Sequence, residues 1–143
     1  MAFALTIGTP DAVAPTLSEL HRTGSVETTW LLHGDGEVLD AIRAVDDAAR
    51  LIWVTRLRRI TEGPERRAAS MRDRAINGLH LHHSDWTGGL TTLFHRFRRL
   101  AWADEANHER VIAEMLAAGI DAVIGSHPDR MIDARRALGE PYL

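Results

Sequence analysis

The stretch that decides the fold begins at Arg99-Leu-Ala-Trp-Ala-Asp-Glu105 and ends at Gly119-Ile-Asp-Ala-Val-Ile-Gly-Ser-His-Pro-Asp129. Its first segment reads as a short apolar strand with Trp102 at its carboxyl end, and a helix of about 14 residues with one apolar face follows. Residues 122–124 then read as a second buried strand, which stops at a turn containing Pro128. A strand, a helix and a strand joined by short links form a βαβ unit, which requires parallel pairing and a right-handed crossover.

The same alternation extends back to the amino terminus, with Pro, Gly and Asp residues at the starts of the helices. Strands are predicted over residues 3–7, 28–32, 51–54, 76–81 (with a weaker pattern), 99–102 and 122–124. Helices are predicted from Pro10 to about Arg22, after Gly36 with Val38, Leu39, Ile42 and Val45 on its buried face, within 55–73, up to about Arg96, and after each of the last two strands. The sequence therefore predicts an α/β fold, a partial (β/α) barrel of about six parallel βα units of the TIM-barrel type, in a single domain over residues 1–143.

Length and composition exclude several classes of protein. The 143 residues are few for a complete barrel, which needs at least about 200. The net charge is −3, and the 17 basic residues, all arginine, form no basic stripe along the sequence, so we expect no nucleic-acid partner. Cysteine is absent, which excludes disulfides and cysteine-based zinc sites. The sequence has no apolar run long enough for a membrane span and no signal-peptide pattern, which favours a cytoplasmic location.

Residues 99–130 resemble the last two strands of the glycerophosphodiester phosphodiesterase family, whose members fold as TIM barrels. In that family the penultimate strand ends in a Trp-Thr-Val-Asn pattern, and the next helix leads to Gly-Val-Asp-Gly-Ile-Ile-Thr-Asp-x-Pro-Asp. The runs here are Trp102-Ala-Asp-Glu105 and Gly119-Ile-Asp-Ala-Val-Ile-Gly-Ser-His-Pro-Asp129, which keep the spacing and the buried positions but not the polar residues. Residues 3–7 take the place of the family's third strand, so its first two strands have no counterpart in this sequence.

The resemblance implies hydrolysis of a phosphodiester to an alcohol and sn-glycerol 3-phosphate, with Ca²⁺ or Mg²⁺ held by carboxylates and two histidines as general base and acid. The family's His-Arg-Gly, Glu-x-Asp and second His come from its first two strands, and a further Glu comes from the third. Residues 3–8 contain no acid and no Lys, so none of these groups can be carried over. We therefore expect no catalytic residue, metal ligand or cofactor in this chain, and no hydrolysis by the chain alone.

Polar and aromatic residues nevertheless follow most of the predicted strands, where parallel α/β folds bind their ligands. An indole beside Arg and His suits a small anionic or glycerol-phosphate ligand. The candidate substrate-binding residues are His33, Arg56, His82, Trp102 and Ser126. Each has an alternative interpretation: His33 as a helix cap, Arg56 with Arg58 and Arg59 in a solvated loop, Trp102 in the core, and Ser126 in a turn without a carboxylate for a triad.

His80-Leu-His82-His83 is the densest histidine cluster, and on a strand His80 and His82 would share one face. With Asp104 or Glu105 they could bind a metal ion, and the alternative is a polar strand end near solvent. Three functions stay open: a truncated or degenerate phosphodiesterase-family domain, a non-catalytic binding module on a barrel scaffold, and a half-barrel that is active only with another chain. Because a partial barrel leaves two sheet edges open, we expect either self-association, as a homo-oligomer, or marginal stability.

Overall fold

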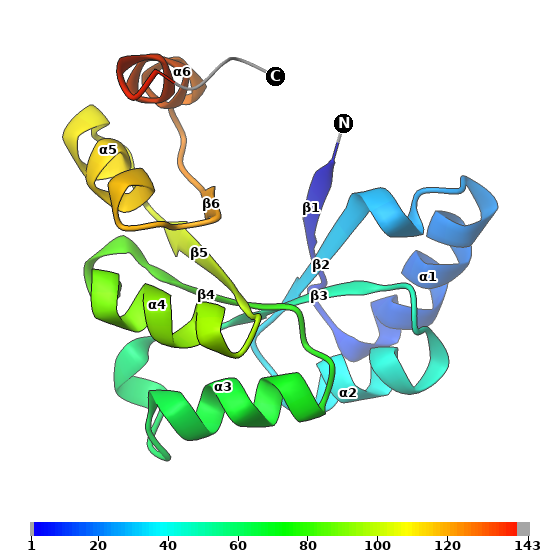
Figure 1. The fold of residues 1–143 in the computed structure, drawn as a ribbon. Helices are drawn as coiled ribbons and strands as arrows, with labels where there is room; N and C mark the ends of the chain where they lie inside the picture. The colour runs from blue at the N-terminus through cyan, green and yellow to red at the C-terminus, as the bar shows by residue number, and fades with distance from the viewer. Residues whose placement is uncertain (1, 140–143) are drawn as a thin grey trace.

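Six parallel strands lie side by side in the order of the chain and form one curled sheet (Figure 1). The computed structural model describes residues 2–139. The strands are β1 (Phe3–Thr6), β2 (Thr29–His33), β3 (Arg50–Val54), β4 (Gly78–His82), β5 (Leu100–Asp104) and β6 (Ala122–Val123). The helices are α1 (Val13–Arg22), α2 (Gly36–Val45), α3 (Pro64–Asp73), α4 (Gly88–Arg96), α5 (Glu109–Ala117) and α6 (Pro128–Ala137). This confirms the predicted partial (β/α) barrel of six βα units.

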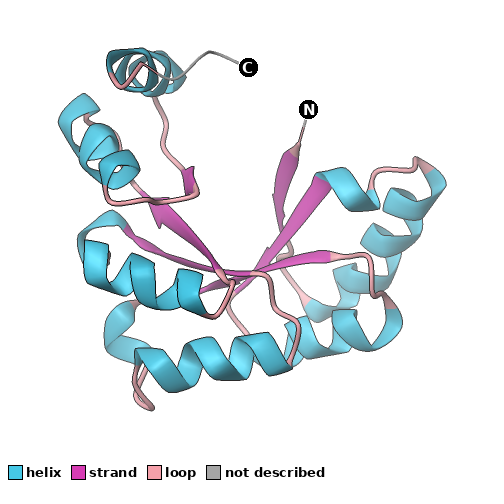
Figure 2. Ribbon diagram, in the orientation of Figure 1, coloured by secondary structure: helices cyan, strands magenta, loops and turns pink. Residues whose placement is uncertain are grey.

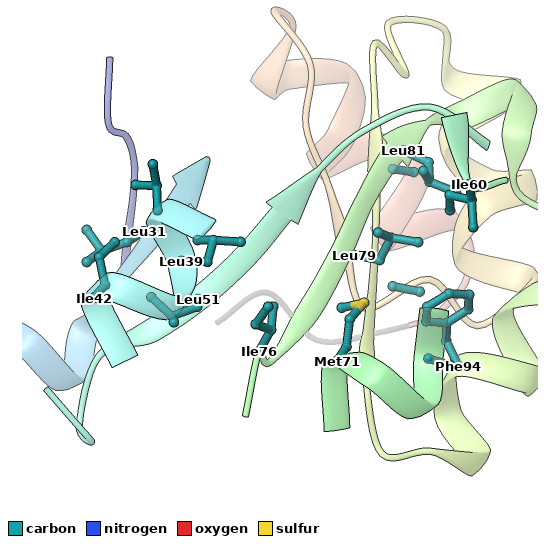
Figure 3. Close-up of a cluster of buried hydrophobic side chains, with 14 of the residues drawn as sticks. Leu31, Leu39, Ile42, Leu51, Ile60, Met71, Ile76, Leu79, Leu81 and Phe94 are labelled. Carbon is teal, nitrogen blue, oxygen red and sulfur yellow. The ribbon is translucent and has the colours of Figure 1, made fainter. Parts of the chain in front are cut away.

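The helices cover the convex side of the sheet, and its concave side is the inner face of the half-barrel (Figure 2). Alternation along each strand divides the apolar side chains between the two sides. The larger cluster lies between sheet and helices and includes Leu51, Leu79 and Phe94 (Figure 3). A smaller cluster on the concave side, which we call the inner cluster, is built on Leu32, Ile52 and Trp102; Trp30, Val54, Leu100, Ala122 and Ile124 pack against it.

Strand β4 has a weaker strand pattern in the sequence, and the structure shows that it is nevertheless a well-buried strand. Four of its five residues are buried, and it pairs over its whole length with β5 and along part of β3. The segment contains few β-branched residues and begins with a glycine, which is why its strand pattern is weak. The structure nevertheless requires a glycine at position 78. A Cβ at Gly78 would lie 2.8 Å from Ile52 Cδ1 and 2.9 Å from Leu100 Cβ, so the neighbouring side chains occupy that space. Packing on both flanks overrides the low strand propensity.

Three further boundaries differ from the sequence prediction. Strand β6 is only two residues long and half-buried, because it is an edge strand, not a buried interior one. Helix α5 begins at Glu109, so its nine residues are fewer than expected. Val45 is 74% exposed although it continues the apolar period of α2, because it is the last residue of that helix. Among residues 2–139, no helix combines the length and apolarity needed to cross a membrane.

The chain connections at the amino-terminal ends of β3 and β4 are held together by one arginine of α2. The guanidinium of Arg43 donates hydrogen bonds of 2.7–3.2 Å to several acceptors from two other segments of the chain. They are the carbonyl oxygens of Asp46, Asp47, Ala49 and Ala75, and Oδ1 of Asn77. The same Oδ1 accepts a hydrogen bond from the backbone of Leu51 in β3. Arg43 thereby joins α2, the start of β3 and the loop that leads into β4.

Candidate functional site

The carboxyl ends of the central strands surround a cavity of about 300 Å³, which we call the rim cavity. It is lined by Gly34, Val54, Thr55, Arg56, Arg59, His80, His82, Asp104 and Glu105. An adjoining cavity of about 330 Å³ shares four of these residues and reaches toward β1. Its lining residues are Thr6, Ile7, Leu32, His33, Gly34, Val54, His80, Asp104 and Ile124. The rim cavity thus lies where parallel α/β folds bind their ligands.

Two histidine–carboxylate pairs join β4 to the end of β5 within the rim cavity. His80 Nε2 lies 3.5 Å from Asp104 Oδ2, and His82 Nε2 lies 3.2 Å from Glu105 Oε2. His82 Nδ1 accepts a hydrogen bond from the backbone N–H of Ser84, so the ring proton of the neutral tautomer is on Nε2, facing Glu105. The sequence placed His80 and His82 on one face of a strand, and the structure confirms this.

His80 is buried, and its ring is not fully hydrogen-bonded. The residue is 6% exposed, and its Nδ1 atom has no hydrogen-bond partner among the described residues. Burial lowers the pKa of His80, and the nearby Asp104 carboxylate offsets this only in part. The imidazole is therefore held neutral between the two cavities, both of which it lines.

Glu105 has a backbone conformation that a residue with a Cβ seldom adopts. Its φ is +56°, in the left-handed region, and its N–H donates to Asp104 Oδ1 at 2.8 Å. Backbone strain of this kind concentrates at functional sites, because the surrounding structure must enforce it. Here it places the carboxylates of two successive residues so that each faces a histidine of β4.

Two arginines line the outer wall of the rim cavity, in different environments. Arg56 Nε donates to Asp85 Oδ2 at 2.8 Å, and this hydrogen bond, more than any other contact, lowers the pKa of Asp85. The charge of Arg56 is thus largely balanced. Arg59 is exposed and has no ion-pair or hydrogen-bond partner for its side chain among residues 2–139. Arg59 is therefore the cavity cation that is available to an anion.

The structure brings together some of the candidate binding residues and separates the others. Arg56 and His82 line the rim cavity, and His33 lines the adjoining one, where its Nδ1 accepts a hydrogen bond from the Asp35 N–H at 2.9 Å. Trp102 is 6% exposed within the inner cluster and lines neither cavity. Ser126 also lies outside both, and its N–H donates to Asn107 Oδ1.

The sequence did not predict that His80 and His82 would each form an ion pair with one of two successive acids, Asp104 and Glu105. It also placed Arg59 in a solvated loop, whereas Arg59 lines the rim cavity. The metal-site alternative had named the same four side chains. Among the described residues, however, no three His, Asp or Glu side chains are arranged to hold a metal ion. The carboxylates face histidines, whereas Ca²⁺ and Mg²⁺ require a shell of oxygen ligands. The residues present therefore do not fit the ion that the resemblance implies.

Acidification is expected to destabilise the fold through His80. The folded protein holds this imidazole neutral at pH values where the unfolded chain binds a proton, so its contribution to stability is complete above the unfolded pKa and is lost below it. The free energy of unfolding should fall as the pH drops below about 6.5, and less steeply in a His80→Gln variant. Urea titrations across this range measure the slope. His127→Gln, at an exposed histidine, is the control; equal slopes in wild type and His80→Gln would contradict the expectation.

Comparison with known proteins supports the fold. No family profile and no curated protein matches the sequence. Among solved structures, the chain is similar to a glycerophosphoryl diester phosphodiesterase from Agrobacterium tumefaciens (TM-score 0.84, 15% identity, 97% of this chain and 59% of that one). It is also similar to an Oleispira antarctica phosphodiesterase in complex with the product sn-glycerol-3-phosphate (TM-score 0.81, 14% identity, 95% and 56%). A mandelate racemase/muconate lactonizing family protein from Azoarcus sp. matches as well (TM-score 0.65, 19% identity, 99% and 42%).

These similarities establish the class of fold: a half-barrel of the kind found in glycerophosphodiester phosphodiesterases, as the resemblance of residues 99–130 implied. The chain spans about half the length of the phosphodiesterase structures that it matches, between 46% and 59%.

Proposed function

We propose that this chain is a domain of the glycerophosphodiester phosphodiesterase type that lacks the family's catalytic groups and binds a small anionic, glycerol-phosphate-like ligand at the rim cavity. The observation that carries the proposal is that Arg59, which has no side-chain partner among the described residues, lines the same cavity as His82 at the carboxyl ends of the strands. A phosphate group would accept hydrogen bonds from this guanidinium and from the histidine ring once the ligand replaces Glu105 as its partner. The similarity to the Oleispira antarctica enzyme, whose structure holds sn-glycerol-3-phosphate, supports the choice of ligand.

Within this proposal, Arg56 and His82 contact the ligand, and His33 lies next to the bound ligand because it lines the adjoining cavity. Trp102 faces the same side of the sheet as Asp104, two residues away, and so supports the cavity from below. Ser126 would reach the ligand only from the next loop. The proposal includes a cytoplasmic location and self-association through the open edges at β1 and β6.

The proposed absence of catalysis follows from the charge arrangement. Cleavage of a phosphodiester requires stabilisation of the negative charge that develops in the transition state, commonly by a metal ion. The two acids of the rim cavity face histidines and, among the described residues, form no metal-binding group. The chain on its own would then bind the ligand without hydrolysing phosphodiesters.

Calorimetric titration with sn-glycerol 3-phosphate tests the binding. We expect saturable binding that becomes about tenfold weaker in Arg59→Gln, because one charge-assisted hydrogen bond is lost. Arg58→Gln is the matched control, since Arg58 is an exposed neighbour that does not line the cavity. Equal affinities in the two variants, or no saturable heat at millimolar ligand, would refute the binding proposal. Release of glycerol 3-phosphate from a glycerophosphodiester with Ca²⁺ or Mg²⁺ present, lost in His82→Ala, would refute the proposed lack of catalysis.

A further inference from the structure

A third cavity, which carries a strong positive charge, lies at the opposite end of the strands from the rim cavity, where α3 and α4 end and β5 begins. It measures about 400 Å³ and is lined by Arg72, Arg96, Phe97, Arg98 and Arg99. We call it the arginine cavity. Because the amino-terminal ends of the strands form this side of the molecule, the arginine cavity is separate from the rim cavity and shares no lining residue with it.

The positive charge of the arginine cavity is poorly compensated. Arg72 bonds to Asp73 at 3.3 Å, and its guanidinium lies over the ring of Phe97 at 5.4 Å. Among the described residues, Asp73 is the one carboxylate paired with any of the four arginines. Arg96 and Arg98 are exposed and have no side-chain partner within residues 2–139. This local excess of positive charge contrasts with the net charge of −3 of the whole chain.

Arg99 is held in place beneath these exposed arginines. Its Nη1 donates to the carbonyl oxygen of Ile76 at 2.7 Å and its Nε to that of Phe97 at 3.2 Å, while Nη2 has no acceptor among the described residues. Burial, and secondarily the charge of Arg72, lower the pKa of Arg99, which is the direction expected for a cation that is not neutralised. A guanidinium fixed in this way loses little side-chain freedom when it binds an anion.

Arg98 is held in an unfavourable backbone conformation at the same place. Helix α4 ends in a Schellman motif, with hydrogen bonds from Arg98 N to His95 O and from Arg99 N to Phe94 O, and φ of Arg98 is +55°. Helices α1 and α5 end in the same motif with Gly24 and Gly119 at this position, where the absence of a Cβ removes the strain, and α3 ends in it with Ala75. The left-handed conformation therefore carries a charged side chain here, where glycine would be less strained.

We propose that the arginine cavity binds the phosphate group of a small anionic molecule. Planar guanidinium groups match the paired oxygens of phosphate, and several of them together neutralise a dianion. The cavity is concave, and its charge comes from one short segment and one helix end, which fits a compact ligand better than an extended polyanion.

The test is calorimetric titration with inorganic pyrophosphate at low ionic strength, comparing wild type with Arg98→Gly and Arg96→Gln. We expect saturable binding that is weakened about tenfold by either substitution, because each removes a charge-assisted hydrogen bond. Arg98→Gly should at the same time raise the melting temperature by about 2–4 °C, because glycine relieves the positive φ. A loss of affinity in that variant therefore cannot result from unfolding. Arg110→Gln, which removes an exposed charge on α5, is the matched control.

Unchanged affinity in Arg98→Gly and Arg96→Gln, or an equal loss in Arg110→Gln, would overturn the proposal, as would the absence of saturable heat. Loss of pyrophosphate binding in Arg59→Gln alone would place the ligand in the rim cavity and would also overturn it. Sedimentation with phosphatidate-containing vesicles separates free phosphate from a lipid headgroup. Stronger association with vesicles than with pyrophosphate would contradict a compact soluble ligand, whereas binding of pyrophosphate without vesicle association supports it.

Discussion

Replacement of Arg43 by Met is expected to lower the free energy of unfolding by about 3 kcal/mol or more. Met keeps most of the apolar stem of the side chain but removes every hydrogen bond that the guanidinium donates to backbone carbonyls and to Asn77. Each such bond contributes about 0.5–1.5 kcal/mol, and a half-buried carbonyl left without a donor adds to the loss. Urea unfolding followed by circular dichroism measures the effect.

Arg110→Met is the control for this substitution, because the Arg110 side chain is 84% exposed and, among residues 2–139, pairs only with Glu114 on the same helix. Such surface changes alter stability by no more than about 0.5 kcal/mol. If Arg43→Met were no more destabilising than Arg110→Met, the join between α2, β3 and the loop before β4 would not depend on this arginine.

Replacement of Trp102 by Ala is expected to cost about 3–5 kcal/mol of stability, the range found for large aromatic side chains in cores. Trp102 is 6% exposed among Leu32 and Ile52, and its ring meets that of Trp30 edge to face with centroids 5.4 Å apart. Phe3→Ala, at a side chain that is 57% exposed on the edge strand β1, should cost much less. Thermal and urea unfolding of the two variants gives the comparison.

The Trp102 result also decides between the two interpretations that the sequence left open. A stability loss of less than about 1 kcal/mol, combined with a loss of sn-glycerol 3-phosphate binding, would show that the indole contacts a ligand and does not hold the inner cluster together. A large stability loss is the outcome that its burial leads us to expect.

The order and direction of the strands were predictable from the sequence, because βα units with short connections have few possible arrangements. Residues 99–129 carried most of this information. The extent to which each strand is buried was less predictable. Burial of β4 depends on neighbours that lie more than twenty residues away in the chain, such as Ile52 and Leu100, and these fit against Gly78 only in the folded sheet. The exposed end of α2 at Val45 likewise depends on what covers the helix, which periodicity alone does not reveal.

The candidate site was predictable in position but not in chemistry. Parallel strands predicted that Arg56 and His82 would meet at one rim, and both line the rim cavity. The pairing of His82 with Glu105 depends on the left-handed backbone conformation of Glu105, which no local sequence pattern predicts. The arginine cavity was missed for a related reason. Its segment 96–99 is visible in the sequence as Arg-Phe-Arg-Arg, but Arg72 joins it only through the packing of α3 beside α4.

The simple order of the strands has a consequence for how the protein folds and fluctuates. Each strand pairs only with its neighbours in the chain, and in the described structure β1 and β6 do not pair with each other. The molecule therefore behaves as a short linear array in which each unit is stabilised by the units on either side, as in solenoid proteins. Cooperativity in such an array passes between nearest neighbours, so local opening begins at the terminal units and becomes rarer toward β3 and β4. Contacts between units adjacent in the chain also have low contact order, which favours rapid folding.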